Sequence, residues 1–461
     1  MRVRNLAVTA TVAALAAAGL TLPLAGSASA APTPKDDFNG DGYRDLAIGS
    51  PKTNSVTVTF GSASGVSAGR AVTVTQDSPR VPGALEAEDE FGENVTTGDV
   101  NFDGYADLVV GAPGEKVTGK PSGSMTVIWG GKMPFTTGGW VLNAPSDTAG
   151  RYGEAAVFND LDYDGTPQLS VISGDNWYFY SSIVGDDRAF GLEEHFLPKG
   201  VRLDGMIAGN FKRKDGVGFV LYGRRADGGL YTAHMNGGVG DYGYQAEVIG
   251  EGDDPTVTPD AATTGDVNGD GYADLITGNP EAGKGGSVTV RLGGEGRFGA
   301  PVTYDQDSAG VPGADEEGDS FGWSVAAGDV TGDGLADLAV GAPTEEVDAT
   351  PGAGSVTLLK STGGTFTSGK AWHQETAGVP GAGEAHDDFG ASVRLKDINK
   401  NGRADLAVGA LGEDIGTTRD VGAVWVLRGT ATGLTSSYAA SFNGGDFGVG
   451  GENANFGRTL R

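Results

Sequence analysis

The stretch Phe321–Pro343 reads FGWSVAAGDVTGDGLADLAVGAP. An apolar strand comes first, then a loop crowded with aspartates, then a second apolar strand that ends in Gly-Ala-Pro. In the first strand the large residues Phe321, Trp323 and Val325 alternate with small ones, and this period of two is typical of a β-strand. Small residues on one face suit an innermost strand of a crowded sheet. The stretch therefore predicts two paired strands of an all-β fold.

The same unit recurs along the chain. Six aspartate loops begin at Asp37, Asp99, Asp160, Asp266, Asp329 and Asp397. A seventh, degenerate copy of the unit begins near Asn210. Intervals of 50 to 68 residues between these starts hold about four short strands with their turns. We therefore predict a seven-bladed β-propeller with calcium-binding loops.

Other residues keep register with the loops. Phe-Gly pairs precede three loop aspartates by eight residues, at Phe91, Phe321 and Phe389. A glutamine precedes each of these phenylalanines by fifteen residues, at Gln76, Gln306 and Gln374. The chain ends with a further Phe-Gly strand, from Phe456, that has no aspartate loop. We expect this C-terminal strand to complete the first blade and close the ring, which removes exposed sheet edges.

The N-terminus has the features of a secretory signal. Arg2 and Arg4 precede an apolar run, and Ala28-Ser29-Ala30 has the small-x-small pattern of a cleavage site. We predict a signal peptide at residues 1–30 and a single propeller domain at residues 31–461 in a secreted, extracellular protein. An uncleaved membrane anchor is the alternative, because the run approaches the roughly 20 residues that span a bilayer.

The composition of the chain limits its partners. A net charge of -29 argues against nucleic acid or an anionic membrane surface as a partner, and favours cations. The chain contains no cysteine, so no disulfide restrains it. Glycine supplies 81 of 461 residues, which favours many short strands joined by tight turns. We expect a monomer that is stabilised by something other than disulfides.

The aspartate loops offer oxygen atoms at their first, third, fifth and ninth positions, and a backbone carbonyl at the seventh. Calcium accepts six to eight such ligands in irregular geometry. The candidate ligands are Asp37, Asn39, Asp41, Tyr43 and Asp45; Asp99, Asn101, Asp103, Tyr105 and Asp107; Asp160, Asp162, Asp164 and Thr166; Asp266, Asn268, Asp270, Tyr272 and Asp274; Asp329, Thr331, Asp333, Leu335 and Asp337; and Asp397, Asn399, Asn401, Arg403 and Asp405.

The loops differ in the number of carboxylates that they offer. The Asp160 loop has Gln168 at its ninth position, and the Asp397 loop has one carboxylate fewer than the strongest loops. We expect about four to six structural Ca²⁺ sites. In the decayed copy, Lys212 and Lys214 replace ligands, so we expect no metal there and hypothesise that an ammonium group supplies the positive charge. An isolated loop of this kind would be an ordinary Asp/Asn/Gly turn, but six copies in register favour metal.

These features resemble the FG-GAP repeat proteins, in particular the propeller of integrin α chains. The resemblance rests on the Phe-Gly pairs, the aspartate loops and Gly-Ala-Pro at Gly111 and Gly341. It implies a seven-bladed propeller with calcium on one face and ligand contacts on the opposite face or rim. The chain looks like a bacterial secreted member of this group.

We predict a binding or adhesion module for an extracellular protein or carbohydrate, and not an enzyme. The alternative is a secreted hydrolase, an esterase or a glycan-active enzyme, on the same scaffold. Gly-x-Ser-x-Gly occurs around Ser67 and Ser320, but a nucleophile elbow needs a strand-turn-helix setting. Glu90 and Asp388 replace Ser320 in the corresponding repeats, and no histidine pairs with either serine in the sequence pattern.

The repeat pattern breaks down between residues 176 and 244. Aromatic and basic residues gather there, and they are the candidates for ligand contact: Trp177, Tyr178, Tyr180, Arg224 and Arg225. Such groups suit carbohydrate stacking or an acidic partner. Ordinary strand aromatics beside a decayed metal loop are the alternative interpretation.

Overall fold

The computed structural model describes residues 36–117, 120–145, 150–160, 167–174, 176–180, 192–196, 200–212, 217–226, 230–236, 245–252 and 261–461. The predicted signal peptide lies outside these residues. Within them, no helix combines the length and the apolar character needed to cross a bilayer. Helical structure in the described part is confined to short 3-10 turns: η1 (Pro51–Thr53), η2 (Ala68–Arg70) and η4 (Gly444–Phe447).

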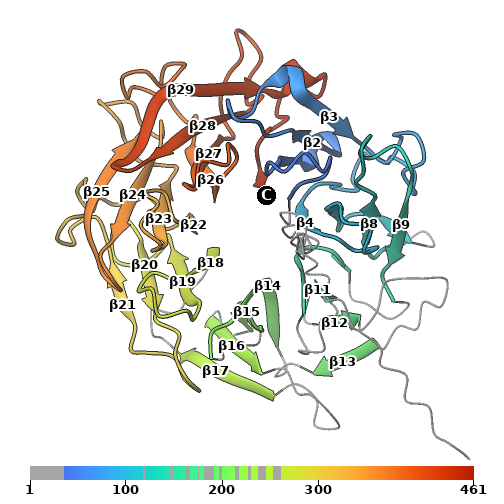
Figure 1. Cartoon of the computed structure of the whole chain (residues 1–461), viewed down its shortest axis with the longest axis horizontal. Helices are drawn as coiled ribbons and strands as arrows, with labels where there is room; N and C mark the ends of the chain where they lie inside the picture. Colours follow the sequence, from blue (N-terminus) through green and yellow to red (C-terminus); the bar gives the residue numbers. More distant parts are fainter. Residues whose placement is uncertain are drawn as a thin grey trace, which may run out of the picture. The chain divides into compact units, whose positions relative to one another are not determined.

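Seven four-stranded antiparallel sheets form the blades of the propeller in the unit Thr33–Arg461 (Figure 1). From the innermost strand outward, the first blade consists of β30 (Thr459–Leu460), β1 (Leu46–Ser50), β2 (Ser55–Thr59) and β3 (Ala71–Val74), and the second of β4 (Asn94–Gly98), β5 (Asp107–Ala112), β8 (Ser124–Ile128) and β9 (Gly139–Asn143). The third blade consists of β10 (Ala156–Asn159), β11 (Gln168–Ser173), β12 (Asn176–Tyr180) and β13 (Leu192–Phe196), the fourth of β14 (Val201–Gly209), β15 (Gly218–Arg225), β16 (Leu230–Asn236) and β17 (Gln245–Gly252), and the fifth of β18 (Ala261–Gly265), β19 (Asp274–Asn279), β20 (Ser287–Arg291) and β21 (Val302–Tyr304). The sixth consists of β22 (Ser324–Gly328), β23 (Asp337–Ala342), β24 (Ser355–Ser361) and β25 (Phe366–Trp372), and the seventh of β26 (Phe389–Lys396), β27 (Asp405–Ala410), β28 (Ala423–Thr430) and β29 (Gly433–Asn443). A small hairpin, β6 (Lys116–Val117) and β7 (Lys120–Pro121), lies outside the blades.

The two ends of the described chain meet in the first blade. β30 pairs with β1, with Leu460 opposite Ile48. Nearby, the ammonium group of Lys396, at the end of β26, lies 3.2 Å from the Asp36 carboxylate and donates to the carbonyl of Asp45 at 2.9 Å. The C-terminal strand therefore completes the first blade, and a buried ion pair connects that blade with the last one.

The apolar core lies between neighbouring blades. Phe321 is fully buried and packs with Val288 and Val290 of the preceding blade, in one cluster with its own strands. Phe91 packs in the same way with Val56 and Val58. The phenylalanine of the Phe-Gly pair in each of these two repeats therefore packs its blade against the preceding blade. Burying one such side chain contributes about 1.5–3 kcal/mol.

The glycine after each of these aromatics lets two backbones approach closely. Gly322 has a φ of +94°, and a Cβ atom there would collide with the carbonyl oxygen of Ser287 in the preceding blade. A Cβ atom on Gly278, in the second strand of that blade, would collide with the carbonyl oxygen of Gly322. The paired glycines thus set the spacing between blades.

Gly322→Ala is expected to destabilise the protein by more than the roughly 1–3 kcal/mol that positive-φ strain alone costs, because it adds a backbone collision. Gly363→Ala is the matched control, since Gly363 has a φ of +88° and a methyl group there would meet no atom within 4 Å. Urea unfolding of both variants measures the difference. Equal losses of unfolding free energy would show that the approach of the blades does not matter.

Candidate functional site

The first aspartate of each fully described loop organises the turn around itself. In the loop after β22, Oδ1 of Asp329 accepts hydrogen bonds from the N–H groups of Gly332 (2.5 Å) and Asp333 (3.2 Å). Its Oδ2 accepts one from Gly334 at 2.8 Å. Asp37 is wrapped in the same manner by Gly40, Asp41 and Gly42. Glycine is required at such positions because the turn has a positive φ, +89° at Gly334.

The last aspartate of each loop connects that loop to the third strand of its blade. Oδ2 of Asp337 accepts from Val330 N (3.0 Å) and Thr331 N (3.2 Å), while Oδ1 accepts from Ser361 N (3.0 Å) at the end of β24. The equivalent strand-end partners in the other loops are Gly61 for Asp45, Gly130 for Asp107, Gly293 for Asp274 and Gly429 for Asp405.

Burial of these last aspartates penalises their ionised form. It raises the pKa of Asp45 and Asp107 to about 7 and that of Asp274, Asp337 and Asp405 to about 6, despite hydrogen bonds from the backbone that lower it. Neighbouring loop carboxylates add repulsion, as Asp333 does at Asp337. A cation at the loop would favour the ionised form of these groups.

The donor set of the loops fits a hard divalent cation. All the side-chain groups that the loops offer in candidate positions are oxygen donors, which calcium prefers. One of them, the hydroxyl of Thr331, is buried without a hydrogen-bond partner. The three aspartates of one loop nevertheless do not all lie within 4.8 Å of one another. Among the described residues, three acidic side chains come that close only at Glu86, Asp89 and Glu115, outside the loops.

Three loops differ from the rest. The amide of Asn399 donates to both carboxylate oxygens of Asp405, at 2.8 and 2.7 Å, so this side chain is turned toward the last aspartate of its loop. Asp162, Asp164 and Thr166 lie outside the described residues, as does Lys214. Lys212 is buried, and its ammonium group lies 5.3 Å from the centre of the Phe298 ring.

The aromatic side chains that the sequence offered for ligand stacking belong to the core. Trp177, Tyr178 and Tyr180 are 0%, 3% and 4% exposed, so their rings are not accessible and the stacking prediction is wrong. Trp177 packs against Phe219 at 5.1 Å between ring centres. Strand β12 lies third in a blade whose two faces are both covered, and aromatic residues fill that space.

The two arginines offered as ligand contacts, Arg224 and Arg225, lie at the end of β15 and are half-buried. Arg224 lies 3.9 Å from Asp204, and it also approaches Glu281 at 4.0 Å. Arg224 thus belongs to a group of charged residues on the blade surface, and neither arginine lines a pocket among those described.

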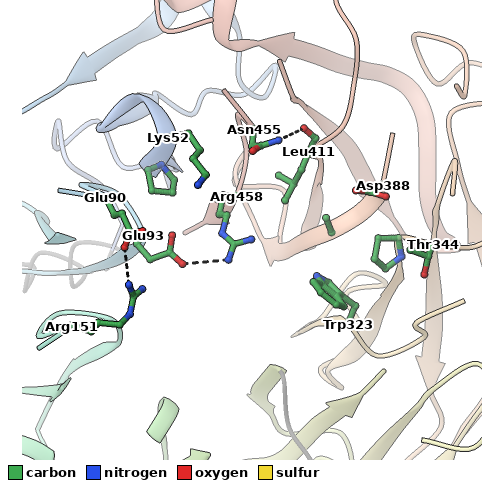
Figure 2. Close-up of a pocket in the computed structure, with 13 residues that line it drawn as sticks. Lys52, Glu90, Glu93, Arg151, Trp323, Thr344, Asp388, Leu411, Asn455 and Arg458 are labelled. Carbon is green, nitrogen blue, oxygen red and sulfur yellow. Dashed lines mark hydrogen bonds and ion pairs between the residues drawn. The ribbon is translucent and has the colours of Figure 1, made fainter. Parts of the chain in front are cut away.

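A pocket of about 460 Å³ lies at the ends of the strands opposite the aspartate loops (Figure 2). We call it the mouth pocket. Its walls come from the starts of innermost strands and the ends of second strands in several blades: Pro51, Lys52, Glu90, Glu93, Arg151, Trp323, Pro343, Thr344, Asp388, Ala391, Leu411, Asn455 and Arg458. Trp323 is 46% exposed there, unlike the buried aromatics of the core.

Charged groups in the mouth pocket pair across blade boundaries. Arg151 lies 3.1 Å from Glu90, and Arg458 lies 3.4 Å from Glu93 (Figure 2). Burial, together with the nearby Asp387 and Asp420, raises the pKa of Asp388 to about 6, although His386 acts to lower it. The pocket therefore presents an apolar indole face beside carboxylates and guanidinium groups.

Sequence reasoning did not predict the mouth pocket, although the repeats carried a signal for it. The residue two places after each Phe-Gly aromatic varies between copies, and four such residues line the pocket: Glu93, Trp323, Ala391 and Arg458. The residue type at this position differs between repeats although its place in the repeat is constant. This pattern indicates a surface position whose residue type the fold does not determine.

Comparisons with known proteins agree with the repeat architecture. The FG-GAP repeat matches residues 35–70, 91–128, 258–290, 321–359 and 389–427. Integrin alpha pat-2 of Caenorhabditis briggsae is 28% identical over 262 residues, which are 55% of this chain and 18% of that protein. Phosphatidylinositol-glycan-specific phospholipase D of Bos taurus is 30% identical over 123 residues, which are 24% of this chain and 14% of that protein. The chain thus spans less than a fifth of the length of these relatives.

Among the solved structures that align with most of the chain at low identity is that of a fungal lectin. It is a lectin from Agrocybe aegerita that recognises non-reducing terminal N-acetylglucosamine, with 15% identity and a TM-score of 0.49, and the alignment covers 88% of this chain and 93% of the lectin.

Asp337→Ala, measured in a metal chelator, is expected to lower the free energy of unfolding by roughly 2–4 kcal/mol, because buried N–H groups lose their acceptor. Asp333→Ala is the control, since Asp333 is exposed and accepts a single hydrogen bond, from Leu335. Urea unfolding gives both values. Similar small losses in the two variants would mean that Asp337 does not hold the loop to β24.

Proposed function

Because the chain is an FG-GAP repeat protein that resembles the integrin alpha propeller, we propose that it is a secreted, calcium-stabilised binding module. Its ligand is an extracellular carbohydrate or protein, and the ligand sits in the mouth pocket. The observation that carries this proposal is the exposed indole of Trp323 in the wall of a cavity of about 460 Å³. A cavity of this size falls within the usual range of ligand pockets, about 300–1,000 Å³.

The chemistry of the mouth pocket favours a carbohydrate over an apolar ligand. An indole face accepts the C–H face of a sugar ring, and polar groups around it orient the hydroxyls. Lys52, Thr344 and Asp388 supply such groups from three different blades. A positively charged side chain of a protein ligand is the other occupant that an indole beside carboxylates would accept.

Trp323→Ala is expected to weaken glycan binding by about fivefold to thirtyfold, because an aromatic contact of this kind contributes roughly 1–2 kcal/mol. Tyr438→Ala is the control, since Tyr438 is 81% exposed on β29 and does not line the mouth pocket. A glycan array identifies the ligand, and calorimetry on both variants gives the affinities. Equal binding by Trp323→Ala and the unmodified protein would exclude the mouth pocket as the ligand site.

Calcium in this proposal stabilises the blades and does not take part in chemistry. The loops that would hold it are those with three aspartates each, beginning at Asp37, Asp99, Asp266 and Asp329. A bound cation offsets the repulsion between neighbouring loop carboxylates, such as that of Asp333 on Asp337, and it does so in a chain that contains no disulfide. The weaker loops at Asp160 and Asp397 bring the proposed number to about four to six.

Removal of calcium with EGTA is expected to lower the melting temperature markedly. Each site that is filled at a hundred times its Kd adds about 2.7 kcal/mol to the stability of the folded state. Scanning calorimetry on EGTA-treated protein, refilled with calcium or with the same concentration of magnesium, measures the effect. Identical melting curves in all three conditions would rule out a structural metal.

A secreted hydrolase remains the second candidate function, because one relative is a phospholipase D. The geometry around the candidate serines does not favour it. The Ser320 hydroxyl donates to the carbonyl of Gly318 and accepts from Thr344, so its described partners include no base. Ser67 precedes only the 3-10 turn η2. A screen of the same protein preparation against esters and glycans for turnover separates an enzyme from a binding module.

A further inference from the structure

The three glutamines that keep register with the Phe-Gly pairs are not explained by the fold or by the mouth pocket. Each donates from Nε2 to a glutamate 39 residues later, at 2.6 Å: Gln76 to Glu115, Gln306 to Glu345 and Gln374 to Glu413. The glutamine follows the outermost strand of one blade, while the glutamate follows the second strand of the next blade. The contact therefore joins two blades, at three places in the ring.

An aspartate completes each of these clusters. Asp89, Asp319 and Asp387 are 0%, 4% and 1% exposed, and each accepts through Oδ2 from the N–H group of the residue three places earlier. In the first cluster the carboxylate oxygens of Glu86, Asp89 and Glu115 all lie within 4.8 Å of one another. In the other two clusters the aspartate lies close enough to the glutamate to raise its pKa by repulsion, Asp319 at Glu345 and Asp387 at Glu413.

Buried oxygen atoms in these clusters have no donor. Oε1 of Gln76, Gln306 and Gln374 is buried without a hydrogen-bond partner, on side chains that are each 3% exposed. Oδ1 of Asp89 is also buried without a partner. A buried acceptor that lacks a partner costs about 1–3 kcal/mol, and here the same feature recurs in three copies.

The carboxylates of the clusters also lack an ion-pair partner. Among the ion pairs that the described residues form, none involves Asp89, Glu115 or their counterparts. Lys116, beside the first cluster, pairs with the exposed Glu88, and its charge lowers the pKa of Asp89 and Glu115 without outweighing their burial. Burial raises the pKa of Glu345 to about 7 and that of Glu413 to about 8, with repulsion from Asp387 contributing to the latter. Such a group either takes up a proton or shares a cation with its neighbour.

We propose that each Gln-Asp-Glu cluster binds a divalent cation of the calcium type. The ligands are the glutamate carboxylate, the aspartate carboxylate and the glutamine Oε1, and in the first cluster the aspartate oxygen is the unpartnered Oδ1 of Asp89. Solvent lies on the side where Glu86, Glu316 and Glu384 are exposed. Such an oxygen set suits calcium.

These sites lie on the side of the blades opposite the aspartate loops. Asp89 and Asp387 directly precede Glu90 and Asp388 of the mouth pocket, so an ion here would also fix the wall of that pocket. The ions would hold neighbouring blades together near the ligand, whereas those in the aspartate loops act within single blades.

The test counts calcium bound to the full chain. The variant carries Glu115→Gln, Glu345→Gln and Glu413→Gln, which preserve side-chain shape and remove one ligand charge in each cluster. The matched control carries Glu88→Gln, Glu281→Gln and Glu452→Gln, which remove the same charge from exposed positions. Equilibrium dialysis against calcium, followed by metal analysis, gives the equivalents per chain. We expect the cluster variant to bind three equivalents fewer than the control, while the aspartate loops keep theirs.

Retention of all calcium by the cluster variant would overturn the proposal, and would mean that the clusters hold protons, because glutamine mimics a protonated glutamate. If the triple variant does not fold, Glu345→Gln alone is measured against Glu281→Gln, and the expected difference is one equivalent. The outcome does not depend on whether the mouth pocket binds a glycan, since no ligand is present.

Discussion

The structure depends most on the buried carboxylate that ends each aspartate loop. Asp337 accepts N–H groups from its own loop and from the end of β24, so one side chain fixes the loop and the third strand together. The arrangement recurs from blade to blade, in a chain with a net charge of -29 and no cysteine. Burial raises the pKa of each such carboxyl group, and repulsion from the neighbouring loop carboxylates raises it further. Positive charge at these fixed positions would therefore stabilise the fold, and we propose that calcium supplies it.

The opposite side of the blades has a different constraint. There, glycines of successive blades meet backbone to backbone, as Gly278 and Gly322 do, while aromatic residues such as Phe321 fill the space behind them. Because this contact fixes the strand starts, the residues just after the glycines are free to vary, and they surround the mouth pocket. The Gln-Asp-Glu clusters lie beside the same contacts. In the blades that keep an aspartate loop, the loop aspartates thus organise one side, and the other side combines close packing with a surface that can be adapted to a ligand.

The repeat made the fold predictable from sequence. Seven blades and the pairing of the last strand with the first both follow from register alone, and both are present. Burial was harder to predict, because Trp177 and its neighbours read equally well as a surface or as a core strand, and the packing of adjacent blades decides between them. The mouth pocket and the Gln-Asp-Glu clusters combine residues from different blades. The sequence marked Gln306 by its register, but no local pattern connects it with Glu345.

Anomalous diffraction from crystals grown in calcium, and then exchanged into a lanthanide, shows directly where cations bind. We expect peaks in the loops that begin at Asp37, Asp99, Asp266 and Asp329, and further peaks between Gln and Glu of the three clusters. We expect none at the decayed loop near Lys212. Aspartate loops without any peak, in crystals that diffract well and hold intact blades, would contradict the claim that cations meet the charge demand of this fold.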